Sequence, residues 1–169
     1  DSIFEANIPT NFVSSTPIDF GLMSLFSQPN ALANNNFDSL MIPFRCLAAN
    51  ITKREQTILK AGDLATAIRA SMTYPFYLAP ISLNGNIMFD GGLYNNFPVD
   101  VMCQEFQPDF IIASNVTTKT PPPDADNLVS QIKSMLIKSS EFEINCSQGV
   151  IVNSNVEDIS TFDFLDNNE

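Results

Sequence analysis

The chain has 169 residues, of which 44% are hydrophobic and 16% are charged, a composition typical of one packed globular domain and not of a disordered chain. Eight basic and nineteen acidic residues give a formal net charge of −11, which we attribute mainly to solubility. This balance excludes nucleic acid as an expected partner, because such binding neutralises phosphates with Lys and Arg, and any peripheral membrane contact would have to use apolar side chains.

The first part of the chain predicts little regular structure. Residues 1–39 are rich in Asn, Ser and Pro, and they predict irregular chain with one short helix, IDFGLMSLF (18–26), that leaves apolar surface exposed. The next run, SLMIPFRCLAANI (39–51), is almost continuously apolar and predicts a strand buried on both faces of a helix-covered sheet. Pro43 places the first half of this run at an edge or in a lead-in segment.

A helix and a hairpin follow. GDLATAIRASMTYP (62–75) predicts a helix with Asp63 as its N-cap and Pro75 at its end. The side chains expected on one face of this helix are Leu64, Ala67, Ile68 and Ser71. The segments FYLAPISL and NIMFD flank Asn84-Gly85, which is the strongest short hairpin signal.

The remaining elements alternate in type. Pro98 is suited to the first position of a helix, PVDVMCQEF, and PDFIIASNV (108–116) predicts a strand. The loop after it contains three consecutive prolines, and NLVSQIKSMLIKSS (127–140) predicts an amphipathic helix. GVIVN (149–153) predicts a last strand. Strands that alternate with helices make the predicted fold class α/β.

The three cysteines are Cys46, Cys103 and Cys146, and none forms a C-x-x-C pair. Their number and wide spacing predict three separate core residues and not a disulfide framework. Because the chain also contains no histidine, we expect no structural zinc site and predict no metal or cofactor. The compartment stays undetermined.

The most distinctive candidate for chemistry is Asp90-Gly91-Gly92. An Asp-Gly pair is also common in simple turns, but here it ends a predicted strand and precedes NNFPVD (95–100). The two glycines leave room for another group to approach and permit a positive φ. A carboxylate at a strand end with open space beside it is suited to act as a general base.

Four stretches together resemble the patatin-like phospholipases, or acyl hydrolases, in order and spacing. They are PFRCLAANI, GDLATAIRASMTYPF, NGNIMFDGGLYNNFPVDVM and PDFIIASNV, which together span about residues 40–116. In this resemblance residues 1–39 correspond to a variable, lid-like region, residues 40–116 to the motif-bearing core, and residues 117–169 to a closing helix and strand. It implies a three-layer α/β fold, a sheet covered by helices, and hydrolysis of ester bonds in phospholipids or neutral acyl lipids.

The resemblance also implies a Ser-Asp dyad in which Asp90 accepts the proton of a nucleophilic serine. The positions that match the supporting motif are Gly91, Gly92, Asn96, Pro98 and Asp100, and we expect Asp100 to have a structural role. A dyad suits a chain without histidine, because a Ser-His-Asp triad could not be assembled from it.

This sequence departs from the family in its nucleophile. None of its six glycines begins a G-x-S-x-G motif, Ser24 and Ser71 are not at strand-to-helix elbows, and the glycine-rich oxyanion loop is absent. We therefore expect the chain to be the C-terminal part of a catalytic domain, inactive alone, whose missing N-terminal half carries the serine. On this view the strand within residues 39–51 has a neighbour upstream of residue 1, and the lone chain exposes apolar surface.

Several alternatives stay open. The chain could be a non-catalytic patatin-like interaction module, or another chain in an oligomer could supply the nucleophile. The apolar side chains within the predicted helix of residues 18–26 are equally compatible with lipid contact and with a local core; these are Phe20, Leu22, Met23, Leu25 and Phe26. The resemblance allows a bacterial cell-envelope or cytoplasmic setting, and it leaves the head group and acyl-chain preference undetermined.

Overall fold

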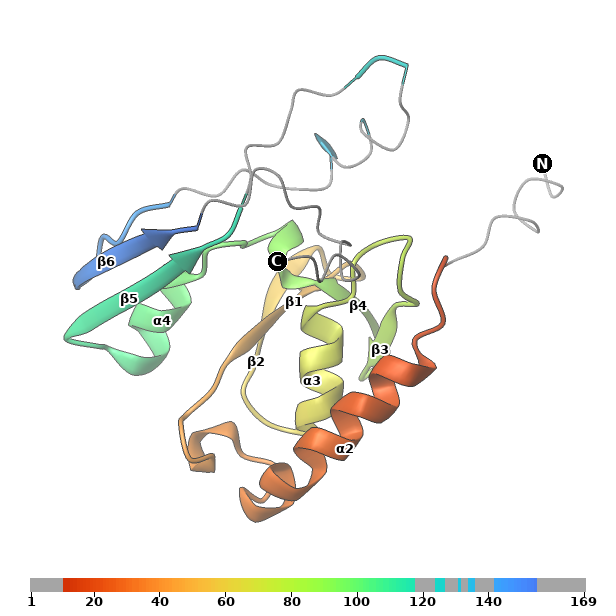
Figure 1. The fold of residues 1–169 in the computed structure, drawn as a ribbon, viewed down its shortest axis with the longest axis horizontal. Helices are drawn as coiled ribbons and strands as arrows, with labels where there is room; N and C mark the ends of the chain where they lie inside the picture. The colour runs from red at the N-terminus through yellow and green to blue at the C-terminus, as the bar shows by residue number, and fades with distance from the viewer. Residues whose placement is uncertain (1–10, 118–123, 127–130, 132–133, 136–141, 155–169) are drawn as a thin grey trace, which may run out of the picture. The chain divides into compact units, whose positions relative to one another are not determined.

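The computed structural model describes residues 11–117, 124–126, 131, 134, 135 and 142–154 (Figure 1). Its residues group into two compact units, and the chain passes from the first to the second between Asn96 and Phe97. Helices and sheets are mixed in it, so the predicted α/β class is confirmed. The three-layer arrangement that the family resemblance implies stays a prediction.

The first unit contains a four-stranded antiparallel sheet in the order β2-β1-β4-β3. Its strands are β1 (Cys46–Asn50), β2 (Glu55–Leu59), β3 (Ile81–Leu83) and β4 (Asn86–Asp90). All five residues of β1 are buried, as the apolar run predicted. Strand β1 pairs with β2 on one edge and with β4 on the other, so the prediction that its neighbour lies upstream of residue 1 is wrong. Strand β2 was not predicted.

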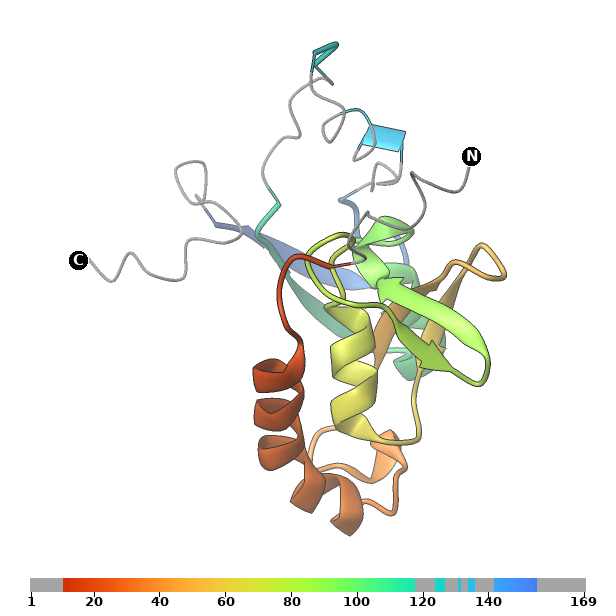
Figure 2. The same cartoon turned by 90° about the vertical axis from the view of Figure 1, so that its right-hand side faces the viewer.

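Helix α3 (Leu64–Ser71) packs against the sheet, and α2 (Thr16–Leu32) packs against α3. Figure 2 shows α3 between α2 and the sheet. The side chain of Asp63 accepts a hydrogen bond of 2.8 Å from the Thr66 N–H, which confirms the predicted N-cap. Helix α3 ends before Pro75, and α2 is much longer than the predicted helix over residues 18–26.

Two groups of buried apolar side chains join these elements. The first group lies between α3 and the start of β1, and consists of Phe37, Cys46, Leu64 and Ala67. The second lies where α3 crosses β1 and β4, and consists of Ala48, Ala70 and Met88. The 3₁₀ helix η1 (Phe37–Ser39) supplies Phe37, which is fully buried. The small alanines allow the backbone of α3 to lie close to the sheet.

The predicted hairpin is present between β3 and β4. Asn84 and Gly85 form its two-residue turn with φ values of 50° and 77°, and Leu83 pairs with Asn86 on either side. Two consecutive positive φ values are the geometry that makes Asn-Gly favourable in such turns. This turn sets the register of β4 and therefore the position of Asp90 at its end.

The second unit contains α4 (Val99–Phe106) and two parallel strands, β5 (Phe110–Asn115) and β6 (Gln148–Asn153). Both strands were predicted. On one face of this pair apolar side chains are exposed, and Ile112, with 75% of its surface accessible, is the most exposed of them. Most of residues 117–140 lie outside the described residues, including all of the predicted amphipathic helix over 127–140 except residues 131, 134 and 135.

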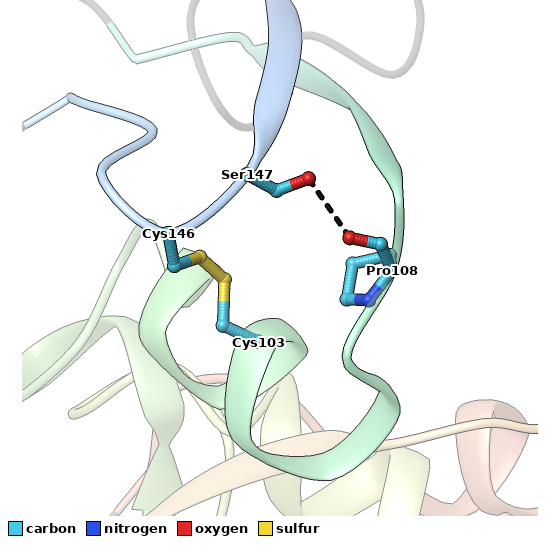
Figure 3. Close-up of a disulfide and its surroundings, with 4 residues drawn as sticks. All are labelled: Cys103, Pro108, Cys146 and Ser147. Atoms are coloured by element: carbon cyan, nitrogen blue, oxygen red, sulfur yellow. Dashed lines mark hydrogen bonds between the residues drawn. A yellow bond between two sulfur atoms is a disulfide. The ribbon is translucent and has the colours of Figure 1, made fainter.

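The cysteine prediction is partly wrong. Cys103 on α4 and Cys146, just before β6, form a disulfide with a Cα–Cα distance of 6.3 Å (Figure 3). Next to it the Ser147 hydroxyl donates a hydrogen bond of 2.8 Å to the Pro108 carbonyl. The fold brings together two cysteines that are 43 positions apart in the sequence, which spacing alone could not predict. Cys46 is a free, buried core residue, as predicted.

Among the described residues, no helix is long and apolar enough to cross a membrane.

Candidate active site

Asp90 is the last residue of β4 and lies beside the central strand, where it pairs with Ala48. Its backbone N–H donates a hydrogen bond of 2.9 Å to the carbonyl of Thr73, which follows α3. The main chain of Asp90 is therefore held from two sides, by the sheet and by the segment after α3. The side chain is half-buried.

The chain turns sharply after Asp90 into the 3₁₀ helix η2 (Gly91–Leu93). The Gly92 N–H donates a hydrogen bond of 2.8 Å to Oδ1 of Asp90, so the aspartate caps this short helix. The Gly91 carbonyl in turn accepts hydrogen bonds from the N–H groups of Tyr94 and Asn95. The turn therefore fixes one carboxylate oxygen of Asp90 in place.

Gly91 is required because the backbone of the central strand leaves no space for a side chain, whereas a side chain at Gly92 would meet only side-chain atoms of Asn96 and Asp90. A Cβ at Gly91 would lie 2.7 Å from the carbonyl carbon of Leu47 in the central strand. A Cβ at Gly92 would lie 2.8 Å from Oδ1 of Asn96 and 3.2 Å from Oδ1 of Asp90. Neither glycine has a positive φ, so the conformational freedom that glycine permits is not used at these two positions. Their lack of a side chain allows the turn to lie close to the neighbouring residues.

The surroundings of Asp90 favour its protonated form. Desolvation by burial raises the pKa of the Asp90 carboxyl, and the hydrogen bond from Gly92 opposes this by lowering it. Among the described residues no Lys or Arg forms an ion pair with Asp90. The raised pKa makes Asp90 a stronger base than an exposed aspartate.

The supporting motif continues past the turn. Asn95 Nδ2 donates a hydrogen bond of 3.1 Å to Oε1 of Gln56, which connects the turn to β2. Pro98 was predicted to be the first residue of α4, but it is the N-cap, one position earlier. The exposed Asp100 lies in the first turn of this helix. A carboxylate there is favourable because it lies at the positive end of the helix dipole. Asn96 belongs to the first unit, whereas Pro98 and Asp100 belong to the second.

The described residues offer no evident nucleophile for Asp90. The Ser24 hydroxyl donates a hydrogen bond to the Phe20 carbonyl within α2, and Ser71 ends α3. Burial raises the pKa of the Cys46 thiol to about 12, so this cysteine is almost entirely uncharged at neutral pH and a poor nucleophile. No group of three or more potential metal ligands occurs in the part of the chain that the structure describes.

The sequence analysis did not identify Arg69, which is buried in α3 and makes several hydrogen bonds. One of them goes to Thr73, whose carbonyl accepts the hydrogen bond from the Asp90 N–H. The available signal was an arginine among the small and apolar residues of AIRAS.

The apolar side chains of α2 were equally compatible with lipid contact and with a local core, and the structure divides them between exposed and partly buried positions. Phe20, Met23 and Leu25 are exposed, whereas Leu22 and Phe26 are half-buried, and Phe26 packs against the first core group.

Comparison with known sequences places this site in a family. Residues 3–102 match the family described as patatin-like phospholipase, and the chain belongs to that family. Its members include lipid hydrolases, so membership associates the chain with lipid hydrolysis at the level of the family.

Similar proteins carry the lysophospholipase name. The chain is 32% identical over 101 residues to lysophospholipase NTE1 of Cryptococcus neoformans, a match that covers 59% of this chain and 6% of that protein. It is 40% identical over 67 residues to lysophospholipase NTE1 of Kluyveromyces lactis, covering 40% of this chain and 5% of that protein. An uncharacterized NTE family protein of Mycobacterium tuberculosis is 32% identical over 72 residues, covering 43% of this chain and 12% of that protein. The chain therefore corresponds to a small part of these relatives.

Proposed function

We propose that this chain carries the general base of a lipid acyl hydrolase, and that Asp90 is that base. The observation that supports this most strongly is the way Asp90 is held. Its backbone is fixed by β1 and Thr73, and its Oδ1 is fixed by the Gly92 N–H. Among the described residues Oδ2 makes no hydrogen bond, so it is the oxygen available to accept a proton.

In the proposed reaction Asp90 acts together with a serine outside these residues. Oδ2 of Asp90 removes the proton from a serine hydroxyl while the serine oxygen attacks the ester carbonyl carbon. The tetrahedral intermediate collapses, the ester C–O bond breaks, and the leaving alcohol takes the proton from Asp90. Water then attacks the acyl-serine while Asp90 accepts the water proton; the bond between the acyl carbon and the serine oxygen breaks, the fatty acid leaves, and Asp90 returns the proton to the serine oxygen.

A carboxylate is a weak base toward a hydroxyl group, since their ordinary pKa values differ greatly. Burial of Asp90 reduces this difference by raising its pKa. Oxyanion stabilisation must supply much of the remaining rate. We assign that role, and the nucleophile, to residues outside these 169, because the sequence contains neither G-x-S-x-G nor a glycine-rich oxyanion loop.

We further propose that the substrate is a phospholipid or lysophospholipid ester. The relatives named lysophospholipases support this class. In the same proposal residues 1–39 form a lid-like region, residues 40–116 the motif-bearing core and residues 117–169 the closing part. The exposed Phe20, Met23 and Leu25 on α2 would be available to contact acyl chains.

A non-catalytic patatin-like module is the second candidate, favoured by the absence of a nucleophile motif from these residues. The two candidates differ in one assay, fatty-acid release from lysophosphatidylcholine by the full-length protein. As a hydrolase it releases fatty acid, and Asp90→Asn lowers kcat by about 10²–10⁴, the usual effect of losing a general base. Asp100→Asn is the matched control and should change kcat far less. No release by the full-length protein would support the non-catalytic module, and the 169-residue chain alone is expected to be inactive under either candidate.

A further inference from the structure

Arg69 is a charged residue in an apolar environment. It lies near the end of α3, and only 3% of its surface is exposed. Its guanidinium uses all three nitrogens: Nε donates to Oδ1 of Asp19 at 2.8 Å, Nη1 donates to Oγ1 of Thr73, and Nη2 donates to the Ala79 carbonyl at 3.0 Å. A buried charge is tolerated when it is paired and hydrogen-bonded in this way.

These bonds hold both ends of the segment that connects α3 to β3. Thr73 lies at its start and Ala79 near its end, and Thr73 is fully buried. The Thr73 hydroxyl also donates to the Arg69 carbonyl at 2.6 Å. Between these two anchor points Phe76 has a φ of 70°, which is rare and unfavourable for a bulky side chain. Such a conformation persists only when the surrounding structure fixes it.

The same segment holds Asp90. The carbonyl of Thr73 accepts the hydrogen bond from the Asp90 N–H, so Arg69 holds the hydroxyl and Asp90 binds the carbonyl of one residue. A shift of Thr73 would therefore move the backbone of Asp90 directly. Through Asp19 the same guanidinium also connects α2 to this network.

We propose that Arg69 is a positioning residue that sets the location of Asp90 through Thr73. The inference rests on the proposed function in assigning Asp90 to catalysis, but the coupling between Arg69 and Asp90 can be measured without catalysis. Lysine cannot replace Arg69 here, because the three acceptors lie around a planar fork and an ammonium group cannot reach all of them from one position.

The test uses the full-length protein with Arg69→Lys, Thr73→Val and Thr73→Ser. Arg45→Lys is the control, because the side chain of Arg45 is also mostly buried, pairs with Asp38 at 2.7 Å and donates to a backbone carbonyl. Amide hydrogen exchange at Asp90, resolved to single residues, measures the coupling directly. We expect exchange about tenfold faster in Arg69→Lys and Thr73→Val, and near-normal exchange in Thr73→Ser and Arg45→Lys.

The kinetic measurement is kcat and KM for lysophosphatidylcholine, below the melting temperature of every variant. Arg69→Lys and Thr73→Val should lower kcat about tenfold or more with little change in KM, because small displacements of a catalytic group reduce the chemical step. Unchanged exchange at Asp90 in Arg69→Lys overturns the proposal, as does equally fast exchange in Arg45→Lys. Provided that Asp90→Asn itself lowers kcat, faster exchange with unchanged kcat also overturns it.

Two outcomes separate this inference from the proposed function. If Asp90→Asn retains activity, the proposed function fails, while the exchange measurement still decides whether Arg69 positions Asp90. If Arg69→Lys does not fold, the two Thr73 variants carry the same test. Equal behaviour of Thr73→Val and Thr73→Ser would then contradict the proposal.

Discussion

Gly91 touches the central strand so closely that replacing it with alanine tests the site geometry directly. The new Cβ would lie 2.7 Å from the Leu47 carbonyl carbon and 2.9 Å from the Leu47 Cβ, whereas ordinary contacts begin at 3.4 Å. The Leu47 carbonyl oxygen lies closer still, so strand β1 or the turn must move by at least about 0.7 Å, the difference between 3.4 and 2.7 Å. Overpacking of this kind costs about 1–3 kcal/mol, and we expect Gly91→Ala to destabilise the protein by that amount.

The control is Gly21→Ala in α2, where a Cβ would meet nothing within 4 Å. An alanine inside a helix is about 0.5–1 kcal/mol more favourable than a glycine, so this variant should be slightly stabilised. Urea unfolding of both variants, compared at unchanged m-value, measures the two changes. If Gly91→Ala is as stable as Gly21→Ala, the packing of the turn against β1 is not as described, and the reason given for the glycine fails.

Three further predictions concern stability, thiols and association. Because the pKa of Asp90 is raised in the folded state, protonation favours folding and stability is lost as pH rises from the ordinary value of 3.8 through the raised one. Asp90→Asn should thus raise the melting temperature at pH 7, by a margin that shrinks toward pH 3, and an equal or lower melting temperature at pH 7 would contradict the burial of this carboxyl. A maleimide should label no cysteine in the native, non-reduced protein and only Cys46 after denaturation, whereas three labelled thiols would exclude the Cys103–Cys146 disulfide. The 169-residue chain alone should self-associate through the exposed apolar face of β5 and β6, because parallel strands are normally covered on both faces. Sedimentation measures this association. A compact monomer that binds no hydrophobic dye would show that this face needs no covering partner.

Signals within a few residues predicted the local structure well. The Asp63 cap requires only Thr66, three positions away, and the hairpin requires only Asn84 and Gly85. Strand β2 was missed because its sequence, EQTIL, is half polar and has no clear alternation. It forms because β1 supplies a buried partner along its whole length, and this stabilisation is not visible in the segment itself.

The sequence predicted the Asp90 motif of the candidate site, but it did not predict the hydrogen-bond network of Arg69 that supports this motif. Asp90, Gly91 and Gly92 are adjacent in the sequence, so a short pattern could identify them, and of the two properties it suggested for the glycines only close approach is used. The network of Arg69 joins Asp19, which is 50 positions away, to Ala79, 10 positions away. The pairing of such distant residues depends on how α2 packs on α3, so it emerged only with the structure.

The most direct measurement of the central claim is the rate at which a fluorophosphonate labels the full-length protein as a function of pH. Such a reagent reacts covalently with an activated serine, and mass spectrometry identifies the labelled residue. If Asp90 is the base, one serine outside these 169 residues is labelled, the rate falls as Asp90 is protonated at acid pH, and Asp90→Asn slows labelling about 10²-fold or more. Labelling of a serine within these residues, or an equal rate in Asp90→Asn, would contradict the account.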